Sequence, residues 1–122
     1  MDASQLASRI ALIRARFITK LAAKIEEIGA SLPILAGNGR TAVDAVAEVY
    51  RRLHDVCGIG ANIGLNQSAQ AARVLVDGVL LKPFRGKRGL STGEMAKFEK
   101  GLDTFRAVAE VEMQSTDANR SI

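Results

Sequence analysis

His54 is the only histidine in the chain, and it lies in the run RRLHDVCGIGANIG. An imidazole has an unperturbed pKa of about 6.5, so one ring nitrogen can act as a nucleophile near neutral pH. A phosphoryl group bound there remains a good donor to a carboxylate, provided that no bulky neighbour obstructs in-line approach. Gly58 follows one helical turn later, although glycine costs about 1 kcal/mol relative to alanine inside a helix. We therefore predict that His54 is a phosphoryl carrier on an open surface.

Three further residues could affect this chemistry. Arg51 precedes His54 by one turn and is the best candidate on that helix to offset the charge of a phosphoryl group. Arg73 is a second candidate cation, but the sequence does not place it. Cys57 is predicted to be a small buried apolar residue and not a catalytic thiol, because there is no second histidine to activate it.

The same run offers neither a metal site nor a nucleotide-binding loop. His54 and Cys57 lie three residues apart and lack further convergent ligands, so we expect no metal and no cofactor on this chain. The glycine-rich GIGANIG stretch follows a helical pattern, whereas a dinucleotide fingerprint requires a preceding strand. Since the sequence also has no ATP-binding signature, we expect a phosphorylated intermediate and not an autonomous kinase.

Apolar residues recur at a helical period in four segments, and the His54 run lies on the second of them. The predicted helices cover approximately residues 4–28, 40–64, 66–81 and 91–113. Ser91 and Glu94 have the spacing of a capping box at the start of the last helix. The basic segment 82–89 is predicted to be a loop, and the polar tail 115–122 is predicted to fray. These helices and their short connections predict an all-α, up-down four-helix bundle in one domain over 1–122.

Residues three and four apart draw the apolar stripes of these helices. In the first helix the stripe is Leu6, Ile10, Ile13, Phe17, Leu21, Ile25 and Ile28. In the second helix the inward stripe is Val46, Val49, Leu53, Val56, Gly60 and Ile63. At about 100° per residue, His54 falls just past Tyr50 at the rim of the second apolar arc. We therefore expect its ring to be held by packing and to be reachable from solvent.

Composition limits the classes of function. The chain is 48% apolar and only 4% aromatic, and its net charge of +4 favours acidic partners. No apolar run approaches the roughly 20 residues that span a bilayer, and no signal-peptide pattern is present. The single cysteine excludes an internal disulfide and is typical of a reducing compartment, so we expect a cytoplasmic location. The basic segment has no aromatic residue beyond Phe84, which argues against nucleic acid as a partner.

The run HDVCGIGANIG resembles the signature of histidine phosphotransfer (HPt) domains. The matching residues are His54, Val56, Gly58, Ala61, Asn62, Ile63 and Gly64. The resemblance implies a helical bundle that accepts a phosphoryl group on His54 from the receiver domain of a hybrid histidine kinase. The bundle then passes the group to the receiver domain of a response regulator. The resemblance also implies that Mg²⁺ is held by the partner receiver domain. The oligomeric state is open from the sequence, and we expect a monomer because a monomer suffices for shuttling.

Two residues depart from the family pattern. Cys57 stands where the family usually has a lysine that steadies the phosphoryl group, and Ile59 replaces a small or hydroxyl-bearing residue. The expected docking surface and phosphoryl environment comprise Arg51, Cys57, Gly58, Ala61 and Asn62. Either Arg51 compensates for the missing charge, or the phosphohistidine is less well stabilised. The alternative function is a non-catalytic HPt-like adaptor that binds a kinase or a response regulator without being phosphorylated.

Overall fold

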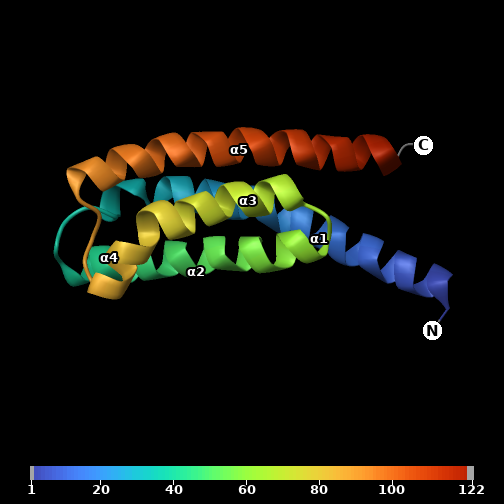
Figure 1. Ribbon diagram of the computed structural model, residues 1–122, viewed down its shortest axis with the longest axis horizontal. Coiled ribbons are helices and arrows are strands. Elements are labelled where there is room, and N and C mark those ends of the chain that lie inside the picture. The colour runs from blue at the N-terminus through green and yellow to red at the C-terminus, as the bar shows by residue number, and fades with distance from the viewer. Residues whose placement is uncertain (1, 121–122) are drawn as a thin grey trace.

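The computed structural model describes residues 2–120, with the backbone alone for 115–120. These residues are helical apart from their connections and one isolated bridge between Ala36 and Leu90, so the predicted all-α class is confirmed. The elements are α1 (Ala3–Ala30), the 3-10 turn η1 (Leu32–Ile34), α2 (Arg40–Asn62), α3 (Asn66–Leu75), the π-helical turn η2 (Val76–Leu80), α4 (Leu81–Gly86) and α5 (Thr92–Arg120). α1 begins at the same end of the molecule at which α5 ends (Figure 1).

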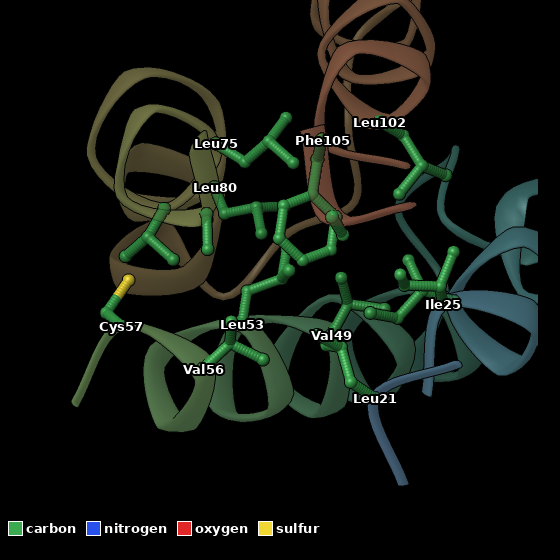
Figure 2. Close-up of a cluster of buried hydrophobic side chains, with 14 of the residues drawn as sticks. Leu21, Ile25, Val49, Leu53, Val56, Cys57, Leu75, Leu80, Leu102 and Phe105 are labelled. Atoms are coloured by element: carbon green, nitrogen blue, oxygen red, sulfur yellow. The ribbon is translucent and has the colours of Figure 1, made fainter. Parts of the chain in front are cut away.

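The apolar core lies between the long helices (Figure 2). The predicted inward face of α2 is confirmed, because all of its members are buried: Val46, Val49, Leu53, Val56, Gly60 and Ile63. Phe98, Leu102 and Phe105 of α5 are buried in the same cluster. Burial of one large apolar side chain contributes about 1.5 to 3 kcal/mol. This packing fixes the rotation of α2 and therefore which residues of the His54 run face solvent.

The apolar stripe of α1 is covered only in its second half. The buried members are Phe17, Leu21, Ile25 and Ile28. Leu6, Ile10 and Ile13 continue the same stripe but are exposed by 52%, 45% and 51%. The first turns of α1 extend beyond α2 and α3 and diverge from the last turns of α5 (Figure 1), which is consistent with the exposure of these side chains.

The prediction of a loop over 82–89 is wrong for the first part of that segment. The third helix continues from α3 through η2 into α4, which ends at Gly86. A proline ring collides with the carbonyl group four residues earlier in a regular helix, and the residue four before Pro83 is Val79, which lies in the wider turn η2. The Phe84 ring stacks on the Tyr50 ring of α2, with centroids 4.1 Å apart and planes inclined by 5°. This tertiary contact holds α4 against α2.

α5 begins at the predicted capping box. Ser91 Oγ accepts a hydrogen bond from the Glu94 N–H at 3.2 Å, and Glu94 Oε1 accepts one from the Ser91 N–H at 2.8 Å. The helix then runs to Arg120, past the predicted end near Met113, because no glycine or proline lies between Met113 and Arg120 to end it. The backbone of 115–120 is helical, the last two residues of the predicted tail lie outside the described residues, and fraying of this tail stays a prediction.

A side chain from α5 fixes the start of α3. The carboxylate of Glu112 accepts hydrogen bonds from the backbone N–H groups of Gln67 at 3.0 Å and Ser68 at 2.8 Å. N–H groups in the first turn of a helix have no partner within the helix, and a negative charge there also stabilises the helix dipole. This contact holds the start of α3 against α5.

Candidate functional site

His54 is exposed on the outer side of α2, as its position in the apolar pattern predicts. Its ring stacks on Tyr50, one turn earlier, with centroids 5.9 Å apart and planes inclined by 22°. Tyr50 is itself held by the parallel ring of Phe84 from α4. The imidazole is therefore supported on one side by two aromatic rings and remains accessible to solvent.

Gly58 leaves the surface beside His54 open. A Cβ atom built on Gly58 would meet no other atom within 4 Å. Ala61 and Asn62, near the end of α2, are also exposed. Gly60, in contrast, is buried against Leu65 and Ala69, so the two glycines lie on opposite sides of the helix. No bulky side chain covers the Gly58 position, and another protein could approach the ring there.

A hollow of about 280 Å³ adjoins the imidazole between α2 and the third helix. The residues that line the hollow are Tyr50, His54, Cys57, Gly58, Arg73, Val76 and Asp77. Arg73 comes from α3, and Asp77 comes from the π-helical turn η2. The hollow thus brings a nucleophilic ring together with one cation and one anion from a different helix.

Cys57 is a buried free thiol at the edge of the apolar cluster, as predicted (Figure 2). Burial raises the pKa of the thiol above its ordinary value of 9.0, and the charge of Asp77 raises it further. The positive charge of Arg73 lowers this pKa, but the effect of burial is larger. Cys57 is therefore neutral at pH 7 and supplies no charge where the HPt pattern has lysine.

The two candidate arginines differ in their surroundings. Arg51 is exposed, forms an ion pair with Glu48 at 3.5 Å and is not among the residues that line the hollow. Arg73, which the sequence left without a place, does line it. α3 brings Arg73 to the hollow, and this packing is not evident from the spacing within α2.

The sequence prediction did not include Tyr50 and Asp77 in the site. Tyr50 was assigned only to the rim of the apolar arc, although its position one turn before His54 was a usable signal. Asp77 carried no such signal, because it reaches the hollow through η2. A π-helical turn changes the rotation of the residues that follow it, and such turns occur frequently at functional sites.

The arrangement suits a surface imidazole that accepts a group from another molecule. Among the described residues, no three His, Cys, Asp or Glu side chains are grouped so that they could hold a metal ion. Within the same residues, every helix is too short or too polar to cross a bilayer. The site therefore consists of an accessible nucleophile, an adjacent guanidinium group and an open glycine.

Comparisons of the chain with protein-family models, curated proteins and solved structures found no match.

Proposed function

We propose that this chain is a histidine phosphotransfer protein that carries a phosphoryl group on His54 between the aspartates of receiver domains. The observation that supports this function is the exposed, ring-stacked imidazole beside the open Gly58. A structural histidine would need neither feature. A carrier needs both, because its ring must stay oriented while the active site of another protein closes over it.

The proposed transfer is a displacement at phosphorus. A nitrogen of the His54 ring attacks the phosphorus of an aspartyl phosphate, and the N–P bond forms as the P–O bond to the carboxylate breaks. The aspartate carboxylate leaves, and the other ring nitrogen keeps its proton. The reverse displacement loads the next receiver domain. Any Mg²⁺ that assists belongs to the receiver domain, so this chain needs no cofactor of its own.

The fold and the resemblance to HPt domains support the same proposal. The proposed topology is an up-down four-helix bundle, with the continuous segment α3–η2–α4 as its third helix. The proposed carrier acts as a monomer in the cytoplasm, because a single exposed ring suffices for shuttling. Its proposed partners are the receiver domains of a hybrid histidine kinase and of a response regulator.

The direct test is transfer from receiver domains encoded in the same genome, each phosphorylated with radiolabelled phosphate on its aspartate. The wild-type chain should acquire label that is labile in acid and stable in base, as expected for phosphohistidine. His54→Gln should acquire none. If the wild-type chain stays unlabelled with every receiver domain, the carrier function is wrong.

A second test separates the nucleophile from the docking surface. Gly58→Gln should slow transfer from a receiver domain about 10- to 100-fold, because a side chain now occupies the approach to the ring. Phosphoramidate, a small donor that releases ammonia as its P–N bond breaks, should still label His54 at the wild-type rate. Gly93→Gln is the matched control, because Gly93 is also exposed with no atom within 4 Å of a built Cβ.

The neutral Cys57 supports a second candidate, the non-catalytic adaptor. An adaptor would bind a receiver domain or a kinase through the Gly58 surface without carrying phosphate. Its binding constant should be the same for wild type and His54→Ala, and no label should appear on either. Label on the wild type that is lost in His54→Ala excludes the adaptor and supports the carrier.

A further inference from the structure

We propose that Arg73 of α3 holds the phosphoryl group on His54 and that Asp77 of η2 opposes it, so that these two residues set the lifetime of the phosphohistidine. This inference rests on the proposed carrier function and assigns the phosphoryl-binding cation, which the sequence assigned to Arg51. It assigns a positioning role to two residues outside the helix that carries the nucleophile.

The position of Arg73 supports the assignment. Among the described residues that line the hollow beside His54, Arg73 is the only cation. It forms no ion pair with any carboxylate that the structure describes. Its guanidinium group is therefore available for an anion, and guanidinium groups bind phosphoryl oxygens through two parallel N–H donors.

A phosphoryl group in the hollow needs the positive charge of Arg73, because none of the other ionisable groups described there supplies one. Cys57 is neutral because burial raises the pKa of its thiol, so it offers no positive charge to a phosphoryl group. Asp77 also lines the hollow, and its negative charge is one cause of the raised pKa of the Cys57 thiol. A phosphoryl group adds nearly two negative charges to this hollow. Without Arg73, the phosphoryl group would meet only the like charge of Asp77.

The charges act on phosphohistidine through its hydrolysis. When the N–P bond breaks in a loose, metaphosphate-like transition state, its electron pair moves to the departing imidazole, and the phosphoryl group changes from two negative charges toward one. A cation at these oxygens stabilises the phosphohistidine more than the transition state, so it slows loss of the group. A neighbouring carboxylate has the opposite effect. Arg73 should therefore lengthen the lifetime of the phosphohistidine, and Asp77 should shorten it.

The test uses the full chain, with phosphoramidate as the donor, so it needs no partner protein. After removal of the donor, the half-life of the phosphohistidine is followed by ³¹P NMR. Arg73→Gln should shorten the half-life about three- to tenfold, and Asp77→Asn should lengthen it about two- to threefold. Arg51→Gln is the matched control, since it removes the same charge one turn from His54 but outside the hollow, and it should leave the half-life unchanged.

A titration of the phosphoryl group gives a readout that a purely structural role would not change. A nearby cation favours the dianion, so Arg73→Gln should raise the second pKa of the phosphoryl group and Asp77→Asn should lower it. The double variant Arg73→Gln/Cys57→Lys should recover part of the lost half-life if the new ammonium group reaches the phosphoryl group. Circular dichroism should show the wild-type helix content in Arg73→Gln and in Asp77→Asn, because Arg73 and Asp77 are both exposed.

The outcomes separate this inference from the carrier function. An unchanged half-life in Arg73→Gln, or an equal loss in Arg51→Gln, overturns the role of Arg73 and leaves the carrier function standing. Stable phosphorylation by phosphoramidate without transfer from any receiver domain overturns the carrier function but not the charge assignment. If phosphoramidate fails to label wild-type His54, the hollow does not accept a phosphoryl group, and the assignment of Arg73 is wrong.

Discussion

The loop before α2 meets the loop before α5 where Gly89 and Leu90 bond to Gly37 and Leu35, and we call this region the closed end. Gly89 is buried there. Arg88 donates from Nη1 to Glu94 Oε1 at 2.6 Å and from Nη2 to Glu94 Oε2 at 3.1 Å. In the hollow beside His54, Gly58 is open and Arg73 is paired with no carboxylate of the described residues. Both regions combine a glycine, an arginine and an acid. The groups of the closed end satisfy one another and stabilise the fold, whereas those of the hollow remain available to another molecule.

The closed end requires its glycine because two backbones approach each other there. The N–H groups of Gly89 and Leu90 donate to the carbonyl oxygens of Gly37 at 3.0 Å and Leu35 at 2.7 Å. A Cβ on Gly89 would stand 2.7 Å from the Leu35 oxygen and closer still to that of Gly37. A Cβ on Gly58, the glycine of the hollow, would meet no atom within 4 Å, so close approach of two backbones does not account for this glycine; in the proposed function it keeps the approach to the His54 ring open.

The largest expected effect is at Gly89. Gly89→Ala should lower the free energy of unfolding by at least about 2 kcal/mol, because the added methyl group forces the two backbones apart and breaks their hydrogen bonds. Urea unfolding followed by circular dichroism measures this change. A loss below about 0.5 kcal/mol would show that the two loops separate easily and would remove the contrast with the hollow.

The second effect is the pH dependence of the closed end. The hydrogen bonds from Arg88 lower the pKa of Glu94 from 4.5 to about 2, with smaller contributions from Ser91. A carboxyl group with a lowered folded-state pKa contributes stability above its ordinary pKa and loses it as pH falls toward the folded-state value. Wild type should exceed Glu94→Gln in stability by about 1 to 2 kcal/mol at pH 6, and the two should converge near pH 2.

Urea unfolding of wild type and of Glu94→Gln at several pH values between 6 and 2 gives the difference between their free energies of unfolding, which tests this prediction. Other carboxyl groups titrate in both proteins, so they cancel in the difference. A difference that does not change over this range would show that the ion pair with Arg88 does not stabilise the folded state.

A smaller effect of opposite sign is expected at Gly58. Gly58→Ala should raise the free energy of unfolding by about 0.5 to 1 kcal/mol, because alanine is the better helix former and its Cβ meets nothing. Thermal unfolding measures the gain. If Gly58→Ala destabilises the protein, the surface beside His54 is not open, and the comparison between the two glycines fails.

The smallest effect is expected at Arg73. Arg73→Gln should change the free energy of unfolding by less than about 0.5 kcal/mol, because an exposed side chain without an ion pair contributes little to folding. Arg88→Gln, in the same urea experiment, should lose clearly more stability than Arg73→Gln, because it loses the charge-assisted hydrogen bonds to Glu94. Equal losses from the two variants would show that Arg73 has a structural partner and is not reserved for a ligand.

The sequence was sufficient for features that depend on one helix alone. The spacing of Val49, Leu53 and Val56 fixed the buried face of α2, and from that face the exposure of His54 and the burial of Cys57 followed. The capping box of Ser91 and Glu94 was equally local, because the helix that starts there determines both of its hydrogen bonds. Helical periodicity holds within a segment whatever packs against it.

The sequence failed where contacts between segments decide the structure. Pro83 and Gly86 are ordinary signals for a loop, but the stack of Phe84 on Tyr50 keeps that segment helical. The Leu6, Ile10 and Ile13 stripe indicated an amphipathic helix correctly, yet periodicity does not show whether a neighbour covers the stripe. Glu112 caps a helix that begins far earlier in the chain, which no local pattern can indicate.

By itself, therefore, the sequence determined the helices, the buried side of α2 and a single imidazole on its outer side, because these depend on the order of residues within one turn or two. Only the tertiary structure decided which charges share the hollow with that imidazole. Arg73 and Asp77 reach it because α3 is held beside α2 and η2 alters the rotation of the third helix. The angle and distance between packed helices depend on all of their contacts together, and for this reason the neighbours of His54 could not be derived from its own segment.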